Sequence, residues 1–370
     1  MKLRYKILSG ASVALLLVVA AAGFTLSYTA DCEPYPGVSS GEASMKAFTY
    51  TCYGSPDVLE FSDVPKPEPG ANEVLVKVRA AGVNPYDWHN LRGSPYFMRL
   101  GTGIGKPKET RLGVDFAGVV EEVGVDVTAF SPGDAVFGGA YGAFAEYVLV
   151  AEDRAIAPKP ANVSFREAAG VGIAGITAMQ ALTDSGKLQA GEKVLINGAS
   201  GGVGTFAVQI AKAMGAEVTG VCSTRNVDLV LALGADRVLD YKKEDYTDSG
   251  SEFDLIVDMV GNHSVGKNRT VLAPAGRYVI VGGPSGDWLG PLMPVINAAV
   301  TSLFVDQQLG MMIAKMRDDD LAALAELMQD GKVRPQLDRT YSLADVPEAI
   351  RYSETGRARG KIIIDVDPAD

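Results

Sequence analysis

The sequence is poor in the residues that build metal centres and disulfide scaffolds. Its 370 residues include three cysteines and two histidines. The cysteines, Cys32, Cys52 and Cys222, lie far apart and form no C-x-x-C pair. This pattern excludes a four-thiolate zinc site, predicts that no disulfide framework forms, and leaves the redox compartment open.

Basic residues are also in deficit. The chain has 34 Lys and Arg against 45 Asp and Glu, which gives a formal net charge of −11. Because an acidic surface repels phosphate backbones, nucleic acid is not an expected partner. Apolar residues make up 47% of the chain, and 42 glycines stand against 19 prolines, which excludes a collagen or a disordered polymer. A globular protein of two or three domains remains.

Charged residues are absent from one long stretch, Ile7 to Ala30. As a helix it spans about 36 Å, enough to cross a hydrocarbon core of roughly 30 Å. Three basic residues precede it and two acidic residues follow, which by the positive-inside rule places the N-terminus in the cytoplasm. We predict a single-pass membrane anchor or signal segment at residues 1–30 and a linker at residues 31–44. Its orientation, cleavage of the leader, and a start at Met45 that yields a cytoplasmic form remain open.

The remaining chain changes in pattern between residues 165 and 192. Before this point, short β-rich runs alternate with glycine and proline turns, which is typical of an antiparallel barrel-like domain. From Glu192 onward strands alternate with helices, which predicts a parallel sheet covered on both faces. The predicted fold class is therefore α/β, preceded by one N-terminal hydrophobic helix.

The strongest chemical signal is the glycine-rich turn at residues 198–204, between an apolar strand and a helix. Glycines let the backbone approach a pyrophosphate, and the N-terminus of the following helix supplies free N–H groups for the anion. Because the turn sits in a strand-turn-helix-strand unit of the required size, it predicts a dinucleotide site. The predicted contacts are Ser200, Gly201, Gly202, Val203 and Gly204.

The next strand indicates which nucleotide binds. An NAD site usually ends this strand in an acid that bonds the ribose hydroxyls. Here the strand ends in Cys222 and is followed by Ser223, Thr224 and Arg225. Two hydroxyls and a guanidinium fit a 2′-phosphate, so we predict NADP(H) as the cofactor. The alternative is that Arg225 is a solvated residue at the start of a helix.

Six ordered motifs carry a family resemblance. They are Ala81-Gly82-Val83-Asn84-Pro85-Tyr86-Asp87, Gly113-Val114-Asp115-Phe116-Ala117-Gly118-Val119-Val120, Pro132-Gly133-Asp134-Ala135-Val136, the glycine turn, Leu233-Gly234-Ala235-Asp236 and Arg359-Gly360-Lys361-Ile362. Over residues 45–366 they resemble the zinc-independent quinone oxidoreductase branch of the medium-chain dehydrogenase/reductase superfamily. The resemblance implies a GroES-like β-barrel catalytic domain at residues 45–168, a Rossmann NADP-binding domain at 169–306, and a segment at 307–370 that returns to the catalytic domain.

Zinc-dependent members of this superfamily carry Cys at the place of Asn84 and Gly-His-Glu at residues 113–115. Since Val114 cannot bind a metal and a catalytic zinc needs three protein ligands, we predict no metal site. Without a Lewis acid the favoured substrates are those that accept hydride readily, namely quinones and α,β-unsaturated carbonyls, with NADPH as the donor. A catalytically silent NADPH-binding scaffold and an NADP-dependent alcohol dehydrogenase are the alternatives. A homodimer is an open expectation.

The resemblance also implies roles for individual side chains. Asn84 and Asp87 would orient cofactor and substrate, and Thr177 would pack near the nicotinamide ring. His89 stands where relatives often have Tyr, and it would either donate a proton or hydrogen bond to the substrate carbonyl or merely pack in the cleft. Tyr241 would contact the adenosine side of the cofactor, with ordinary strand packing as its alternative.

Overall fold

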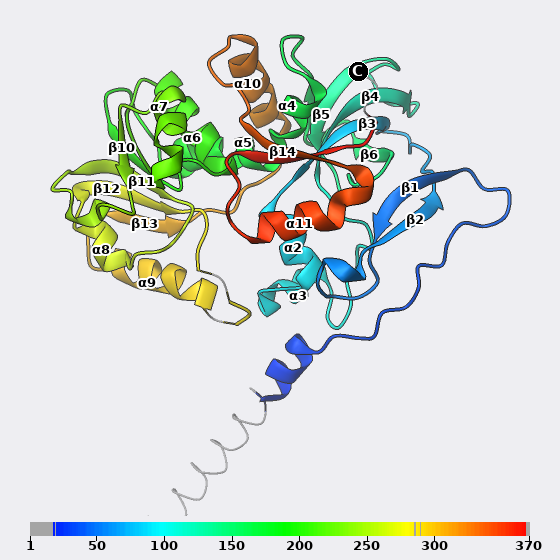
Figure 1. The fold of residues 1–370 in the computed structure, drawn as a ribbon, viewed down its shortest axis with the longest axis horizontal. Coiled ribbons are helices and arrows are strands. Elements are labelled where there is room, and N and C mark those ends of the chain that lie inside the picture. The colour runs from blue at the N-terminus through cyan, green and yellow to red at the C-terminus, as the bar shows by residue number, and fades with distance from the viewer. Residues whose placement is uncertain (1–17, 19, 285, 289, 368–370) are drawn as a thin grey trace, which may run out of the picture.

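One largely antiparallel sheet forms the centre of the barrel-like part of the chain (Figure 1). The computed structural model describes residues 18, 20–284, 286–288 and 290–367. The seven-stranded sheet has the order β14-β15-β3-β4-β5-β7, with β6 also paired to β3. Val74, Val76 and Val78 share one face of β3 and enter the same buried cluster, as the period of two in a strand requires. The strands are β3 (Glu73–Val83), β4 (Asp115–Val123), β5 (Ala135–Gly139), β6 (Tyr147–Ala151), β7 (Ile156–Pro158), β14 (Leu337–Ser342) and β15 (Lys361–Asp365), beside a hairpin of β1 (Ser44–Thr49) and β2 (Glu60–Pro65).

A second, six-stranded sheet follows the order β10-β9-β8-β11-β12-β13, and all its strands run parallel. Val194, Leu195 and Ile196 in β8 are fully buried, because helices cover both faces of the sheet. Figure 1 shows α6 and α7 on one face, and α8 and α9 on the other. The predicted α/β fold is confirmed. The elements are β8 (Lys193–Asn197), α6 (Gly202–Ala213), β9 (Glu217–Cys222), α7 (Val227–Ala232), β10 (Arg237–Asp240), β11 (Phe253–Asp258), α8 (Val265–Arg269), β12 (Leu272–Ile280), α9 (Met293–Ser302) and β13 (Gln308–Met311).

The C-terminal part of the chain returns to the first sheet. After β13 it forms α10 (Asp318–Gln329), β14, α11 (Val346–Glu354) and β15. Strand β15 pairs antiparallel with β3, and Ile362 lies opposite Val83. This register brings Lys361 next to Asn84, which precedes α2 (Pro85–Arg92). The chain also forms α3 (Arg99–Thr102), α4 (Phe165–Ala169) and α5 (Gly172–Gln180).

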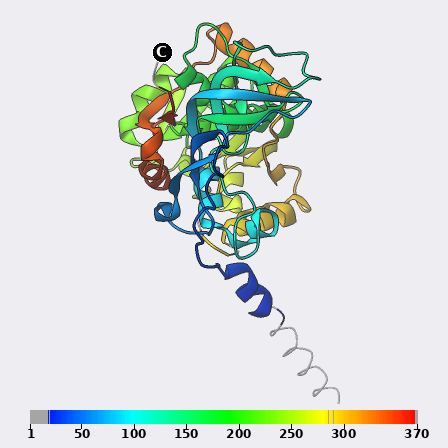
Figure 2. The ribbon, with the colours of Figure 1, turned by 90° about the vertical axis from the view of Figure 1, so that its right-hand side faces the viewer.

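The predicted membrane anchor is corrected by the structure. Residues 1–17 and 19 lie outside the described residues, so most of the predicted span does too. Residues 20–27 form a short helix that projects from the body of the molecule (Figures 1 and 2). Across the described residues no helix is long and apolar enough to cross a bilayer, and this finding corrects the prediction of a single-pass anchor for that part of the chain.

Polar contacts hold the end of this short helix to the body of the protein. The Arg99 guanidinium donates hydrogen bonds to the carbonyl oxygens of Leu26, at 3.0 Å, and Tyr28, at 2.7 Å. Thr29 forms a β-bridge with Gly105. The hydrophobicity of residues 7–30 did not reveal these contacts, because hydropathy does not show which backbone groups find partners in the fold.

The cysteine prediction is also wrong. Cys32 and Cys52 form a disulfide, although 20 residues separate them in the sequence. Cys222 is free and buried. Their distance along the chain hid this pair, because the segment after the N-terminal helix runs back alongside the protein and meets the chain just after β1. The bond ties the N-terminal segment to the barrel-like part.

We expect loss of this disulfide to destabilise the protein. A closed loop of this length accounts for roughly 3 kcal/mol of unfolding free energy, since the cross-link restricts the unfolded chain. Urea denaturation of the C32S/C52S variant should show this loss. The C222S variant is the control, because it leaves the disulfide in place. A C32S/C52S midpoint equal to that of C222S would contradict the expectation.

Candidate active site

The glycine turn after β8 has the geometry of an anion cradle. Gly198 has φ of +92°, a conformation that favours glycine. A Cβ on Gly204 would lie 2.1 Å from the Gly198 carbonyl oxygen. The turn can therefore be this tight only because residue 204 has no side chain. Helix α6 begins directly after Gly201, and among the described residues no side chain caps it. Its first N–H groups are therefore available to a pyrophosphate, and the residues fit the predicted dinucleotide.

The end of β9 is joined to this turn by a residue that the sequence analysis missed. The Asn226 amide nitrogen donates to the hydroxyl oxygens of Ser200, at 2.8 Å, and Ser223, at 3.3 Å. Its carbonyl oxygen Oδ1 is buried without a partner in the described part of the chain. A buried acceptor of this kind calls for a donor, and a ribose hydroxyl of the cofactor fits. Asn226 follows directly on the predicted phosphate contacts, which is the signal that could have found it.

The other predicted nucleotide contacts lie around the same strand end. The Thr224 hydroxyl donates to Asp240 Oδ2 at 2.7 Å, so it is already engaged within the protein. Arg225 is exposed and donates to the Arg357 carbonyl oxygen at 2.9 Å. Tyr241, which follows β10, is 51% exposed, which disfavours strand packing as its role. Their contacts with a cofactor stay predictions.

A buried polar cluster lies where β3 ends. The Lys361 ammonium donates to Asn84 Oδ1 and lies 3.4 Å from Asp115 Oδ2. The Asn84 amide nitrogen donates to the same Asp115 oxygen at 2.9 Å, and the Ile173 backbone N–H donates to Asp115 Oδ1 at 2.8 Å. Gly172 makes room, because a Cβ there would lie 2.2 Å from Asp115 Oδ1. The sequence analysis identified Asn84 but missed Lys361 and Asp115.

Asp87 is the second buried carboxyl group of this region. Its Oδ2 accepts a hydrogen bond from the Asn84 backbone N–H at 2.7 Å, which caps α2. Its Oδ1 is buried and has no partner among the described residues. Burial raises the pKa of Asp87 to about 7, and the charge of Asp115 adds to this rise. The hydrogen bond from Asn84 lowers the pKa but does not outweigh burial. This carboxyl group can therefore hold a proton near neutral pH.

His89 lies two residues further along α2, in its last turn. Its Nδ1 lies 2.6 Å from the Ser94 carbonyl oxygen, and only a protonated nitrogen can donate to a carbonyl. Burial lowers the pKa of His89, so the ring is neutral near pH 7 with its free lone pair on Nε2. Its ring also packs against Trp88, with centroids 3.6 Å apart. A donor role for Nε2 therefore requires the ring to take up a second proton.

Two further observations complete the site. The Tyr86 and Tyr141 hydroxyls are 2.8 Å apart, a pair that the sequence analysis missed. Thr177 is buried in α5, one turn after Ile173, and α5 packs on α6, the helix of the glycine turn. The structure thus places Asn84 and Asp87 in contact at the start of α2, His89 in the last turn of the same helix, and Thr177 on α5, which packs on α6.

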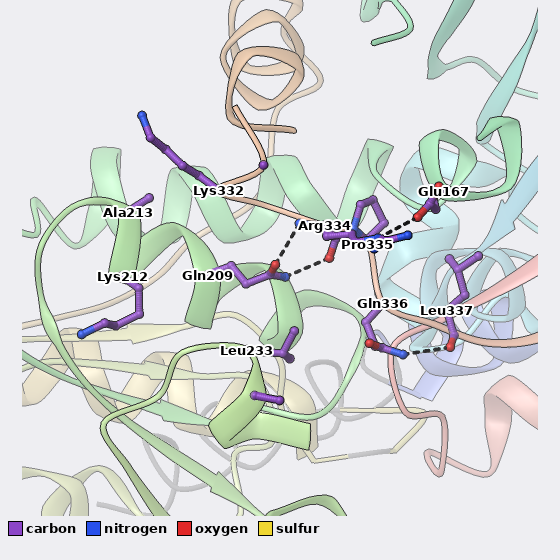
Figure 3. A pocket seen from close by; sticks show the side chains of 12 residues that line it. Glu167, Gln209, Lys212, Ala213, Leu233, Lys332, Arg334, Pro335, Gln336 and Leu337 are labelled. Carbon is purple, nitrogen blue, oxygen red and sulfur yellow. Dashed lines mark hydrogen bonds and ion pairs between the residues drawn. The ribbon is translucent and has the colours of Figure 1, made fainter. Parts of the chain in front are cut away.

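A polar hollow of about 750 Å³ lies apart from these groups, along the C-terminal half of α6 (Figure 3). It contains none of the predicted site residues. The Gln209 side chain in it bonds the backbone of Arg334, whose guanidinium pairs with Glu167 at 3.1 Å. Lys212 pairs with Asp236. Because these charges already have protein partners, the hollow is not a candidate active site.

Comparisons with known proteins agree with this geometry. The family profiles for the alcohol dehydrogenase GroES-like domain and for the zinc-binding dehydrogenase match residues 70–161 and 233–364. Over 342 residues the chain is 34% identical to 2-methylene-furan-3-one reductase of Solanum lycopersicum, covering 87% of this chain and 79% of that protein. The chain belongs to the medium-chain dehydrogenase/reductase superfamily. Its quinone oxidoreductase-like character, as predicted, is confirmed by further relatives.

One of these relatives is a chloroplastic quinone-oxidoreductase of Triphysaria versicolor, 34% identical over 342 residues, covering 87% of this chain and 98% of that protein. The solved quinone oxidoreductase from Coxiella burnetii superposes with a TM-score of 0.77 at 31% identity, covering 88% of this chain and all of that one. The chain is accordingly a pyridine-nucleotide-dependent oxidoreductase of this superfamily.

The zinc ion in the name of one family profile does not fit the residues present. Asn84 and Val114 stand at the ligand positions of the zinc-dependent members, and Val114 has no donor atom. Asp115 is bonded to an ammonium, an amide and a backbone N–H. Within the described residues no group of three His, Cys, Asp or Glu side chains could hold a metal. The donor set therefore disagrees with a catalytic zinc.

The raised pKa of Asp87 predicts a pH dependence of stability. An unfolded Asp titrates near pH 4, so between about pH 4 and 7 the native protein binds one more proton than the unfolded chain. Stability from this group is therefore present at low pH and lost as pH rises through 7. Relative to D87N, the wild type should lose on the order of 3 kcal/mol between pH 4.5 and 8. Denaturant unfolding of both proteins at each pH measures this difference. The contribution of His89 titration to the unfolding free energy is common to both proteins and cancels when the two are subtracted. A pH-independent difference would contradict it.

Proposed function

We propose that the protein is a zinc-independent NADPH-dependent reductase of quinones or α,β-unsaturated carbonyls. The observation that carries the proposal is a complete dinucleotide cradle beside a site whose metal-ligand positions hold Asn84 and Val114. The relatives named as a quinone oxidoreductase and as a 2-methylene-furan-3-one reductase support the two substrate classes. Substrates of both classes accept hydride without a Lewis acid to polarise them.

The chain's own residues position the reactants and handle the proton. When bound, the reduced cofactor supplies the hydride. The turn at residues 198–204 and the N-terminus of α6 would hold its pyrophosphate, and Asn226 Oδ1 would accept from a ribose hydroxyl. Asn84 and Asp87 would orient the reacting groups through the start of α2, because the Asn84 side chain is saturated by protein partners. Thr177 would pack near the nicotinamide.

The preference for NADP(H) over NAD(H) is the finer part of this proposal. No acid follows β9, and Ser223 and Arg225 lie at the strand end that is tied to the glycine turn. Arg225 is exposed, and the C-terminal segment holds its guanidinium by one hydrogen bond, which leaves other donors for a 2′-phosphate. Thr224 would contribute only by giving up its bond to Asp240.

Arg225→Ala should weaken NADPH binding by roughly 1.5 to 3 kcal/mol, about 10- to 100-fold in Kd, because a charged hydrogen bond to phosphate is lost. NADH binding should stay almost unchanged. Fluorescence titration with both cofactors measures this. Arg237→Ala is the matched control, since that exposed arginine at the start of β10 bonds Ser251 instead. Equal losses for NADPH and NADH would refute the assignment.

His89 would serve as proton donor in this proposal. Because neutral His89 donates through Nδ1 to Ser94, donation from Nε2 needs the imidazolium, which is populated below the lowered pKa. His89→Ala should lower kcat and kcat/KM together by about 100-fold at pH 6 and less at pH 8, with NADPH affinity intact. NADPH oxidation with a quinone and an enone measures the rates, and a chelator should not change them.

The other histidine supplies the control. His263 pairs with Asp245 beyond the glycine turn, so His263→Ala should leave the rates unchanged. A His89→Ala enzyme with normal rates at both pH values would leave solvent as the proton source. A wild type that binds NADPH but reduces neither substrate class would overturn the proposed function itself.

Quaternary structure and domain limits belong to the proposal as well. We propose boundaries at residues 45, 168 and 306, and a homodimer formed along β13, the edge strand of the parallel sheet. Support for the dimer comes from exposed apolar side chains on and beside α9 and β13, namely Ile296, Val300, Leu303, Phe304 and Met311.

A further inference from the structure

The Lys361 side chain is the feature of the site that the proposed mechanism leaves without a role. It is 3% exposed, and the Asp115 carboxylate beside it is fully buried. Its alkyl chain passes two glycines: a Cβ on Gly170 would lie 3.3 Å from Lys361 Cβ and Cγ, and a Cβ on Gly202 would lie 3.3 Å from Lys361 Cδ. Gly202 is the first residue of α6 in the dinucleotide cradle. Lys361 therefore reaches from the cradle to the start of α2.

The ammonium determines how the Asn84 amide is oriented. Asn84 Oδ1 accepts from Lys361, and Nδ2 donates to Asp115 at 2.9 Å. A flipped amide would place its NH₂ group against the ammonium and its oxygen against the carboxylate, and both contacts would be repulsive. Asn84 also donates its backbone N–H to Asp87, so a fixed Asn84 fixes the first turn of α2.

Stability alone does not account for such a cluster. Taking an ammonium and a carboxylate out of water costs several kcal/mol for each ion, and well-packed apolar residues are often as stable. Both Asp115 oxygens and the Asn84 amide are nevertheless satisfied by specific partners. The buried charges thus fix a single geometry, which apolar side chains would not do, and they do so next to the residues that the proposed mechanism uses.

We propose that Lys361 is a positioning residue of the reductase site, which holds the Asn84 amide and through it the first turn of α2, which carries Asp87 and leads to His89. The inference rests on the proposed function for its kinetic readout. In contrast to a mere counter-ion of Asp115, Lys361 acts through the hydrogen bond that its ammonium donates to Asn84. The positive charge at this corner of the site is thus supplied by the last strand of the fold.

Kinetics of Lys361 variants in the full chain test this. Lys361→Met should lower kcat roughly 10-fold or more, because the start of α2 loses the hydrogen bond that orients Asn84. The KM for NADPH should change less than about threefold, because the cradle stays intact. Lys361→Arg, which keeps the charged donor, should recover much of the rate. In Lys361→Ala, propylammonium chloride should restore activity at least severalfold, whereas tetramethylammonium chloride, which has the charge but no N–H, should not.

The K361M/D115N double variant separates positioning from charge balance. It removes both buried charges, so its melting temperature should rise above that of Lys361→Met, which leaves an unpaired buried carboxylate. Its kcat should stay low. Two outcomes would overturn the proposal and leave Lys361 as a counter-ion of Asp115. One is a K361M/D115N variant in which kcat recovers together with the melting temperature. The other is a wild-type kcat in Lys361→Met.

A second readout needs no turnover and so separates this inference from the proposed function. Trp88 lies on α2 against His89, and Trp288 is the other tryptophan of the chain. In a W288F background, Trp88 emission should shift with Lys361→Met and stay unchanged with Lys361→Arg. A wild type without quinone or enone turnover would defeat the proposed function alone, whereas Trp88 emission unaffected by Lys361→Met would defeat the positioning role.

Discussion

The antiparallel pairing of β15 with β3 is the constraint on which the site depends, because it joins segments that are 277 residues apart in the sequence. This pairing holds the C-terminal segment, which follows the parallel sheet in the sequence, against the first sheet. The pairing sets a register in which Lys361, the first residue of β15, lies beside Asn84, the residue that follows β3. The geometry of α2, and with it the environment of Asp87 and His89, then follows from a strand formed last along the chain.

This constraint also explains why two equally buried acids so close together differ in their partners. Burial raises the pKa of Asp115, and three donors from three different segments oppose that rise without cancelling it. Burial raises the pKa of Asp87 to about 7, and this group has one donor, the Asn84 backbone N–H, and one buried oxygen without a partner among the described residues. The two carboxyl groups are therefore distinguished by the number of their donors, and Asp87 is the one with an oxygen left for a further partner.

Sequence reasoning succeeded where the signal is local. The turn at residues 198–204 could be predicted because its glycines, the strand before it and the helix after it are contiguous, and the absence of an acid after β9 is visible at the same range. It failed where contacts are distant. Lys361 was noticed as part of a motif but given no role, because its partner lies across the chain, and the disulfide of Cys32 with Cys52 depends on the path of an irregular segment. Asn226 was missed although it directly follows the predicted phosphate contacts, and its buried acceptor oxygen without a partner became visible only in three dimensions.

The protonation of His89 is set by the same kind of distant contact. Its Nδ1–H is fixed by the Ser94 carbonyl oxygen, while the Ser94 hydroxyl donates to Asp287 Oδ1 at 2.5 Å. Asp287 lies beyond β12 of the parallel sheet, and its carbonyl oxygen accepts from the Tyr96 N–H at 2.7 Å. The loop that orients the imidazole is therefore held by the part of the chain that binds the cofactor. The Nδ1–H tautomer of His89 therefore depends on the contact between the loop after α2 and the segment after β12, just as the orientation of the Asn84 amide depends on the contact of β15 with the end of β3. In both cases a polar group of α2 is oriented by a residue that is far away in the sequence.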